Sequence, residues 1–539
     1  MTLVLHIRKG EARRVEKETQ RKAIRLLKRG RIGLFHLLFS RIGLLVLMIL
    51  LQLLLVFYAY YSFSGYIPHL ITIQTVFVVL MVLYLINTPQ EATAKITWLI
   101  FIMIAPVFGT LFLLYTRTDL GHRKLRDRLR KIILDTANLL PQDEATTAEM
   151  EETSPASAAL LRYLNRTGSF PAYANTEVKY FPLGEDMFRE LLRRLEEAER
   201  SIFLEFFIVE EGLMWGEILE VLARKAAEGV DVRVLYDGSN EFFTLPRSYP
   251  QKLKKLGIRC KVFAPLRPFL STHYNYRDHR KILVIDGHTA FTGGVNLSDR
   301  YINRERVFGH WKDTAVMLRG EAARSFALMF LQMWNIDEAE PAYERELVAP
   351  VPEHEDMPGY VIPYADSPLD EYRVGELVYI DLLNRAEKHV RIMTPYLILD
   401  GELETALRFA AERGVEVELM LPGVPDKKAP YALAKTHYAP LLSSGVKIYE
   451  YTPGFVHAKV FSADGRRAVV GTINLDYRSL YHHFECAAYL DGVPCIAAIE
   501  RDFDETLLLC RRVTEEDLTR IGFGQRLLGI LTKAIASLL

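Results

Sequence analysis

The stretch HRKILVID, residues 279–286, decides the fold and raises the question of what the chain does. Its apolar run is typical of a buried strand, yet it carries His279, Lys281 and Asp286. Burying ionisable groups costs on the order of several kcal/mol unless they are paired. A strand of this composition therefore needs a reason for its charges.

The same H-x-K-x-x-x-x-D spacing recurs in HAKVFSAD, which begins at His457, continues through Lys459 and ends at Asp464. An asparagine, Asn296 or Asn474, follows each histidine at the same offset. A duplication kept only for folding would explain repeated apolar residues. It would explain repeated His and Lys on buried strands poorly, so the repeat indicates shared chemistry.

The flanking segments repeat as well and alternate between strand-like and helix-like patterns, which is typical of α/β folds. The strand, helix and strand expected at 201–209, 217–229 and 230–238 recur at 390–398, 403–414 and 415–423. We therefore predict an α/β fold with two similar halves, residues 156–345 and 346–539, related by pseudo-twofold symmetry.

Residues two apart on a strand share a face, so the His and Lys of each motif point the same way. The motif Asp lies at an odd offset, and we expect it to be a structural partner. Packing the halves about a twofold axis would bring two imidazoles and two ammonium groups into one cleft, with the amides of Asn296 and Asn474. Such a cleft suits a phosphate, with one histidine as nucleophile, the other as acid and base, and the lysines and asparagines stabilising the oxygens. This chemistry requires no metal and no other cofactor.

Each imidazole needs an acceptor on its second ring nitrogen to fix its tautomer. Glu485, in HHFECAAYL, and Asp313, in HWKDTAV, are the candidates, although either carboxylate would also suit a solvated or ion-paired position. His482 and His483 lie beside Glu485 and raise the question of a metal site. Adjacent histidines rarely chelate one ion, so we favour an ordinary structural role for them.

The two motifs with their trailing asparagines resemble those of the phospholipase D superfamily. The wider match, from about residue 70 to the end, resembles the bacterial cardiolipin synthases of that superfamily. It is carried by HRKILVIDGHTAFTGGVNLSDRY, GHWKDTAVMLRG, MTPYLI, YEYTPGFVHAKV, and VGTINLDYRS with a later FE. The resemblance implies that one phosphatidylglycerol gives its phosphatidyl group to a histidine and a second accepts it, yielding cardiolipin and glycerol.

Family analogy assigns the nucleophile to His279 and the acid and base to His457, while the near-symmetry of the halves leaves the reverse order open. It also implies that the carboxylate following each motif orients a catalytic histidine. Glu485 and Asp313 stand at different offsets from the motifs that precede them, and the offset of Asp313 is the longer, so the transfer to Asp313 is the less direct one.

Residues 1–41 carry twelve Lys or Arg against three Glu, and residues 42–90 contain no charged side chain. Because one span needs about 20 apolar residues, we predict membrane helices near 42–62 and 70–86, and a third at 96–116. The positive-inside rule favours the cytoplasm both for residues 1–41 and for the basic segment after residue 116. Three full spans would put the two basic segments on opposite sides of the membrane. Either one apolar segment is therefore interfacial or re-entrant, or the second basic segment lies outside the cytoplasm despite its charge. We expect a multi-pass protein of a bacterial plasma membrane with its catalytic domain on the cytoplasmic side.

Residues 117–155 are basic and then acidic, and the acidic part from Pro141 to Pro155 is typical of a linker. The C-terminal stretch from Arg520 to Leu539 is basic and apolar. Two interpretations of it stay open: a tail that lies on lipid headgroups, and a helix that packs on the second half.

The formal net charge is zero, so no overall basic field points to nucleic acid, and a nuclease is disfavoured. The four cysteines form no CxxC pair. A membrane-bound phospholipase D that uses water as acceptor is the nearest alternative, because only the acceptor pocket would differ. A non-catalytic scaffold would have no use for paired histidines. The oligomeric state and the exact donor and acceptor lipids do not follow from the sequence.

Overall fold

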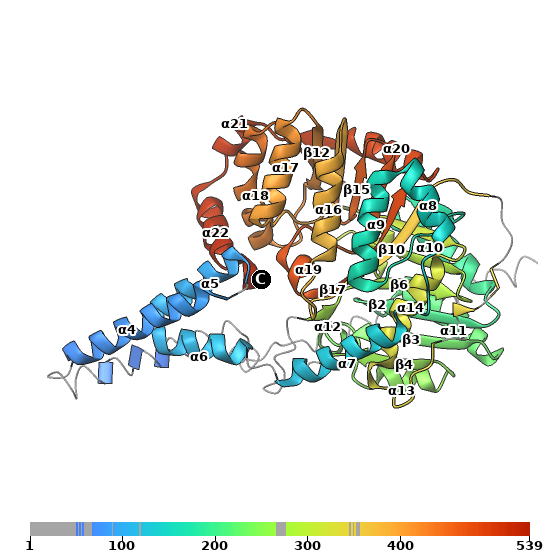
Figure 1. The fold of residues 1–539 in the computed structure, drawn as a ribbon, viewed down its shortest axis with the longest axis horizontal. Coiled ribbons are helices and arrows are strands. Elements are labelled where there is room, and N and C mark those ends of the chain that lie inside the picture. Colours follow the sequence, from blue (N-terminus) through green and yellow to red (C-terminus); the bar gives the residue numbers. More distant parts are fainter. Residues whose placement is uncertain are drawn as a thin grey trace, which may run out of the picture. The chain divides into compact units, whose positions relative to one another are not determined.

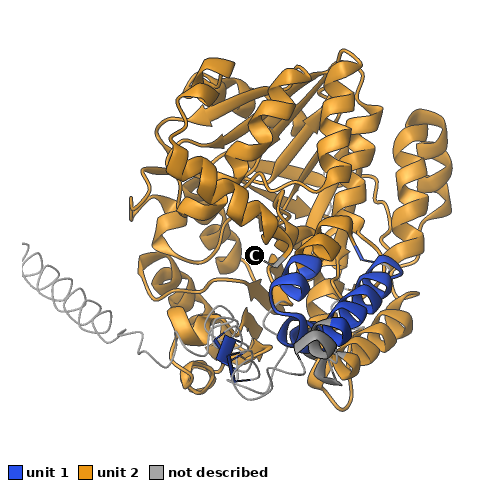
Figure 2. Ribbon diagram, turned by 90° about the vertical axis from the view of Figure 1, so that its left-hand side faces the viewer, with its two compact units in different colours: residues 1–90, 98–117 blue, residues 91–97, 118–539 orange. Residues whose placement is uncertain are grey.

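The computed structural model describes residues 67–88, 90–117, 120–265, 276–343, 347–348, 350–351 and 356–538, with six residues between 50 and 58. The chain divides into two compact units (Figure 2). One unit contains the described parts of residues 1–90 and 98–117, and the other contains residues 91–97 and the described parts of 118–539. Both motif strands lie in the second unit.

The first half of that unit is built on a seven-stranded sheet in the order β1-β9-β7-β6-β2-β3-β4. The first motif supplies β6, which pairs antiparallel with β2, while β2, β3 and β4 run parallel. Helix α10 is amphipathic, and its apolar residues, from Met187 to Leu195, pack on one face of this sheet together with α11. The bounds are β1 Glu177–Phe181, α10 Gly184–Glu196, β2 Ser201–Phe206, α11 Leu213–Ala227, β3 Asp231–Asp237, α12 Asn240–Phe243, α13 Tyr249–Lys254, β4 Arg259–Phe263, β6 Lys281–Ile285, β7 Thr289–Gly293, η3 Asp299–Ile302, β9 Ala315–Arg319, α14 Ala323–Trp334 and η4 Asn335–Asp337.

The second half repeats the arrangement on a sheet whose strands follow the order β10-β17-β16-β15-β11-β12-β13-β18. The second motif supplies β15, antiparallel to β11, and β11, β12 and β13 run parallel. Figure 1 shows α16, α17 and α18 side by side on one face of this sheet. The bounds are β10 Tyr360–Asp366, α16 Val374–Arg385, β11 His389–Met393, α17 Gly401–Glu412, β12 Glu416–Pro422, α18 Lys428–Ser443, β13 Lys447–Tyr451, β15 Val460–Ala463, β16 Arg467–Gly471, α19 Tyr477–Tyr481, β17 His483–Asp491, α20 Ile496–Leu507, β18 Cys510–Arg512, α21 Glu515–Thr519, α22 Phe523–Ala534 and η5 Ala536–Leu538.

The two halves share one buried apolar cluster, to which Ile282 and Phe330 contribute from the first half and Val470 and Phe503 from the second. Two short pairings also cross between the halves. Strand β5 (Arg277–Asp278) pairs in parallel with the start of β17, and β14 (Gly454–Val456) pairs in parallel with β8 (His310–Lys312). The predicted α/β fold with two similar halves is therefore confirmed.

The predicted linker over residues 117–155 is wrong, because the described part of this stretch is folded. Helix α7 (Leu120–Thr136) packs on α14, and α8 (Glu144–Thr153) buries Met150 completely. Helix α8 was not predicted because it contains few apolar residues. Its N-terminus is capped by the Asp143 carboxylate, which accepts from Thr146 N at 2.7 Å. Few apolar residues suffice when a short helix docks on a preformed core.

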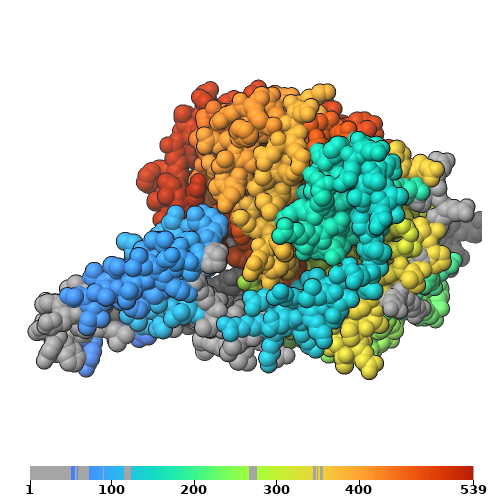
Figure 3. Space-filling view, viewed as in Figure 1, coloured from blue at the N-terminus to red at the C-terminus, as the bar shows by residue number. Residues whose placement is uncertain are grey.

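The boundary predicted at residue 156 also requires correction. Helix α9 (Pro155–Gly168) precedes the first sheet in sequence but packs on the second half. Ser157 Oγ is hydrogen-bonded to Tyr489 Oη at 2.8 Å, and Leu161 shares a buried cluster with Val378 of α16. In Figure 3 the atoms of α9 lie against those of α16 on the surface.

The predicted membrane segments fall on the first unit. The segment at 42–62 lies largely outside the described residues, and α4 (Ile67–Ile86) covers the segment at 70–86. The run at 96–116 is two helices, α5 (Ala92–Ile104) and α6 (Pro106–Arg117), because a proline removes a helix hydrogen bond and clashes with the preceding turn. Within the described part of the chain, every helix falls short of the length or apolar character that a bilayer crossing demands. The membrane spans stay predictions.

The C-terminal helix α22 packs on α18 at Gly529, where an added side chain would lie 2.5 Å from the Ala432 carbonyl oxygen. The packing of the C-terminal stretch on the second half, one of the two interpretations left open, is therefore confirmed. Its outer face remains apolar, with Phe523 81% and Ile530 63% exposed.

Candidate active site

Each motif histidine lies just before its strand, at the point where the chain bonds to the other half. The backbone N–H of His279 donates to the Phe484 carbonyl oxygen at 3.0 Å, and that of His457 donates to the Lys312 carbonyl oxygen at 2.7 Å. Each acceptor immediately precedes a candidate carboxylate in the sequence. The pseudo-twofold symmetry therefore extends to the backbone that holds the two imidazoles.

The two carboxylates hold the histidines in a crossed arrangement. His279 Nδ1 lies 2.8 and 3.0 Å from the two carboxylate oxygens of Glu485, and His457 Nδ1 lies 2.6 Å from Asp313 Oδ2. Each carboxylate thus orients the histidine of the opposite half, not the one whose motif precedes it in sequence. Among the described residues, no hydrogen bond engages either Nε2, which leaves both atoms available to a substrate.

Glu485 is completely buried, and burial raises the pKa of its carboxyl group well above the ordinary value, against the charge of Lys281 and a hydrogen bond from Thr472. We assign an ionised carboxylate, because its oxygens accept from both His279 Nδ1 and Thr472 Oγ1. An ionised Glu485 fixes the proton of His279 on Nδ1 and the lone pair on Nε2. That is the tautomer a nucleophile at Nε2 requires.

Both motif lysines are buried beside their histidines. Lys281 Nζ donates to the His279 carbonyl oxygen at 2.5 Å, and Lys459 Nζ donates to the His457 carbonyl oxygen. Burial lowers the pKa of Lys281 to about 8 and that of Lys459 to about 7. Two ammonium groups in so dry a place favour binding of an anion, which would raise both pKa values again.

The imidazoles respond to the same surroundings. Burial and the charge of Lys281 lower the pKa of His279 well below its ordinary value, and Lys459 and His457 contribute further. Burial and Lys459 lower the pKa of His457 to about 4. The charges of one half therefore reach the histidine of the other, and both rings are neutral in the ligand-free protein.

The two asparagines are engaged in the surrounding backbone. Asn296 Oδ1 accepts from Ile208 N at 3.0 Å, and its Nδ2 donates to Tyr301 Oη at 3.0 Å. The side chain of Asn474 hydrogen-bonds the Asp476 carboxyl group, while its Oδ1 has no partner among the described residues. Each amide keeps a proton for a ligand, and direct phosphate binding by these residues stays a prediction.

The aspartates of the two motifs lie away from the imidazoles. The Asp286 carboxylate accepts from the backbone N–H groups of residues 199–201, and Asp464 accepts from those of residues 387–389. Both residues adopt left-handed backbone conformations, with φ of 54° and 56°. They anchor the beginnings of β2 and β11, which is the structural role that the odd offset predicted.

Two side chains flank the histidines: Trp311, which sequence reasoning missed, and His483, to which it gave only an ordinary structural role. The His483 ring lies 5.3 Å from the His279 ring, and the Trp311 ring lies 5.2 Å from the His457 ring, at similar interplanar angles of 38° and 37°. Each stands two residues before the carboxylate that holds the neighbouring histidine. The rule that residues two apart share a strand face, applied to the carboxylates as well as to the motifs, would have found both.

His279, His483 and Glu485 lie close enough to offer three ligand atoms to a metal ion. Such an ion would break the bond that holds His279 and would face two ammonium groups, so the site suits an anion better than a cation. A second acidic group lies outside this site and consists of Glu376, Asp400 and Glu402.

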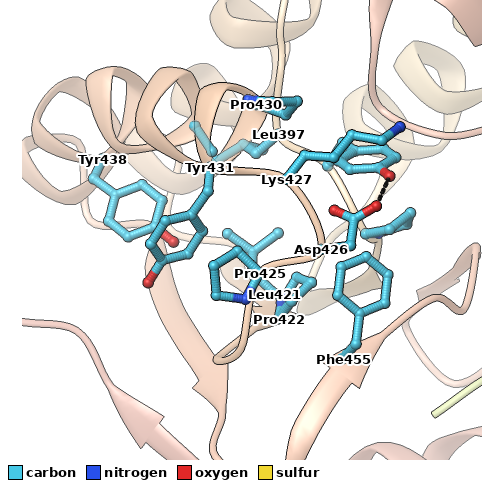
Figure 4. Close-up of a pocket in the computed structure, with 13 residues that line it drawn as sticks. Leu397, Leu421, Pro422, Pro425, Asp426, Lys427, Pro430, Tyr431, Tyr438 and Phe455 are labelled. Atoms are coloured by element: carbon cyan, nitrogen blue, oxygen red, sulfur yellow. Dashed lines mark hydrogen bonds between the residues drawn. The ribbon is translucent and has the colours of Figure 1, made fainter. Parts of the chain in front are cut away.

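A largely apolar pocket shares the residue Phe455 with the surroundings of His457 (Figure 4). Phe455 forms one wall, and its ring lies 6.1 Å from the His457 ring and 4.7 Å from the Trp311 ring. Tyr396 donates to Asp426 at 2.7 Å at the rim. The lining consists of Pro395, Tyr396, Leu397, Leu421, Pro422, Pro425, Asp426, Lys427, Pro430, Tyr431, Ala434, Tyr438 and Phe455.

A protein-family model described as the PLD-like domain of cardiolipin synthase matches residues 191–334 and 379–507, which include both motifs. An uncharacterized protein of Streptococcus mutans is 54% identical over 458 residues, 85% of this chain and 99% of that protein. A protein of Geobacillus kaustophilus named cardiolipin synthase is 34% identical over 454 residues, 84% of this chain and 90% of that protein. The crystal structure of phosphatidylserine synthase from Haemophilus influenzae matches 71% of this chain over 98% of its own length. The TM-score is 0.54 and the sequence identity is 16%, which shows a shared fold.

Proposed function

Since the chain belongs to the family of cardiolipin synthases with a phospholipase D-like domain, we propose that it transfers a phosphatidyl group between two phosphatidylglycerol molecules. The products are cardiolipin and glycerol. The observation that carries this proposal is the crossed clamp, in which Glu485 holds His279 and Asp313 holds His457. It leaves one unbonded Nε2 from each half beside two buried ammonium groups.

In the first step, His279 Nε2 attacks the phosphorus of one phosphatidylglycerol and forms a P–N bond. The P–O bond to the headgroup glycerol breaks, and His457 gives a proton to the departing oxygen. A neutral His279 suits the nucleophile. The anionic substrate raises the pKa of His457 from its ligand-free value of about 4, which equips it to act as the acid.

In the second step, His457 takes the proton from a glycerol hydroxyl of the second phosphatidylglycerol. The hydroxyl oxygen forms a new P–O bond, and the P–N bond to His279 breaks, which restores the enzyme. Lys281 and Lys459 stabilise the negative charge on the phosphate oxygens throughout. Relatives named cardiolipin synthase support a second lipid as the acceptor in place of water.

We also propose that the protein is held at a bacterial plasma membrane, with its catalytic half-sites on the cytoplasmic side. The uncharged sequence from 42 to 90 and the basic segments at 1–41 and after residue 116 support this placement. Tethering would raise the effective concentration of two lipid substrates at the site. Reporter fusions after residues 41 and 155 test the orientation, and an external location for the second fusion would contradict it.

The test of the activity is expression of the full chain in cells that lack cardiolipin, followed by lipid profiling. We expect cardiolipin from the wild type and none from His279→Ala or His457→Ala. His437→Asn is a matched control, because His437 is a buried histidine held by a carboxylate outside the site. Phosphatidic acid without cardiolipin would favour the hydrolase, and unchanged lipids in every strain would favour a scaffold.

A further inference from the structure

His483 is a buried histidine beside the reactive centre that the proposed mechanism does not use. It begins β17 two residues before Glu485, so its side chain shares the face of the strand that carries the clamp. Its ring lies 5.3 Å from that of His279 and is only 7% exposed. The side chain therefore lies next to the imidazole that would bind the substrate.

Neither ring nitrogen of His483 has a hydrogen-bond partner within the part of the chain that the structure describes. Nδ1 approaches Glu485 Oε1 only to 3.7 Å, beyond hydrogen-bonding distance, and that carboxylate is already engaged by His279 and Thr472. Buried polar atoms without partners are rare in native proteins, and each one costs free energy. Two on one ring indicate a ligand that supplies the partners.

The charge state of His483 limits which ligands could hydrogen-bond to both of its ring nitrogens. Burial and the nearby charges of Arg478, His482 and Lys281 lower the pKa of His483 well below its ordinary value. A neutral imidazole carries one N–H donor and one acceptor nitrogen. A phosphate oxygen only accepts, and two lysines already serve it. A hydroxyl group both donates and accepts, so it matches the ring.

The corresponding position in the first half strengthens this interpretation. Trp311 stands beside His457 as His483 stands beside His279, and its Nε1 also lacks a partner among the described residues. An indole offers a donor alone. The two half-sites therefore differ at this position, because His483 can both donate to and accept from a hydroxyl, whereas Trp311 can only donate.

We propose that His483 binds a hydroxyl group of the lipid's glycerol headgroup and so selects glycerol-bearing phospholipids. The ring N–H donates to the hydroxyl oxygen, and the bare ring nitrogen accepts the hydroxyl proton. This inference rests on the proposed function and adds the residue that gives it substrate preference.

The test compares two donor lipids with the purified full chain in mixed micelles. Phosphatidylglycerol is measured beside phosphatidylpropanol, whose headgroup has the same carbon chain without the two free hydroxyls. The readout is the ratio of the single-turnover rate constants for release of the headgroup alcohol, because phosphatidylpropanol has no hydroxyl that could accept the phosphatidyl group in a second step. We expect the wild type to prefer phosphatidylglycerol by roughly 10- to 100-fold, because propanol leaves the buried ring unpaired.

His483→Phe keeps the planar shape and removes both polar atoms, so the ratio should fall toward one. His483→Asn keeps a donor and an acceptor and should retain most of the preference. His437→Asn again serves as the buried-histidine control and should leave the ratio unchanged. An unaltered ratio in His483→Phe would overturn the proposal, even if its total activity fell.

If His483→Phe does not fold, inhibition of the wild type decides the matter. Glycerol 1-phosphate should then inhibit more strongly than propyl phosphate, and equal inhibition would overturn the proposal. Alcohol release is measured whether the acceptor is water or a lipid. A wild type that prefers phosphatidylglycerol but makes only phosphatidic acid would therefore refute the proposed function and leave the role of His483 standing.

Discussion

The half-sites around His279 and His457 share the same clamp and differ in their walls. In each, a carboxylate of the opposite half holds Nδ1 and a lysine two residues on lies against the histidine backbone. The wall beside His279 contains the polar ring of His483, whereas the wall beside His457 consists of the aromatic rings of Trp311, Tyr301 and Phe455. The two halves therefore share the clamp that holds each imidazole and differ in the side chains around it.

The carboxylates themselves show the same division. The Glu485 carboxylate accepts a hydrogen bond from the hydroxyl of Thr472. Asp313 lies against Gly294, where an added side chain would be 2.0 Å from Asp313 Oδ1. Thr472 and Gly294 occupy equivalent places, at the same offset from the histidines of their motifs. A glutamate that accepts from a threonine hydroxyl and an aspartate packed against a glycine therefore hold their histidines in the same way. The geometry of the clamp is thus more restricted than its composition.

The largest expected difference between the half-sites comes from removing each imidazole in turn. His279→Ala and His457→Ala should each lower turnover by about 10⁴-fold or more, because each removes a group that forms or breaks a bond. Phosphatidylglycerol labelled in its phosphatidyl part should leave label on the His457→Ala protein and none on His279→Ala. Label on His279→Ala alone would exchange the two roles and break the assignment.

Removing the charge of each clamp should affect the two histidines differently. Glu485→Gln and Asp313→Asn should each cost about 10³-fold, because the imidazole loses the acceptor that fixes its tautomer. Because the clamps cross, Glu485→Gln should slow the formation of the labelled enzyme at His279 in rapid-quench measurements. Asp313→Asn should slow both its formation and its loss, because His457 is the acid of the first step and the base of the second. An Asp313→Asn protein that forms and loses the label at the wild-type rates would contradict this assignment.

The dry environment of the histidines should appear in the pH dependence of stability. Burial holds the pKa of His457 at about 4, against about 6.5 in an unfolded chain. Between those values the unfolded chain binds a proton that the folded chain does not, so the free energy of unfolding falls as the pH falls. The contribution of His457 is on the order of 3 kcal/mol over that window. The melting temperature of His457→Asn should drop less than that of the wild type between pH 7 and 5, and equal drops would refute this.

The smallest effect should come from the motif aspartates. Asp286→Asn and Asp464→Asn should each cost about 1–2 kcal/mol of stability, since the carboxylate loses charge-assisted bonds to backbone N–H groups. Asparagine tolerates the left-handed conformation found at both positions. Turnover per folded molecule should stay within about twofold of wild type. A large loss of turnover with an unchanged melting temperature would make these residues part of the chemistry.

Much of the fold and the core of the site followed from repetition. The repeated motif and its flanking strands predicted two α/β halves, and the two-residue period predicted that each His and Lys share a face while each Asp turns away. The helix over residues 144–153 was missed, because its few apolar residues find a core that the rest of the chain builds. The helix break at Pro106 was underestimated, although proline disfavours a continuous helix.

The sequence by itself determined the residue types of the two motifs, since their spacing repeats and strand periodicity is local. Only the tertiary structure decided which carboxylate holds which histidine, because β5 and β14 cross to the opposite half. It also decided that His483 and Trp311 are wall residues, since their partners lie far away along the chain. Local periodicity specifies which way a side chain points, whereas long-range packing specifies what it meets there.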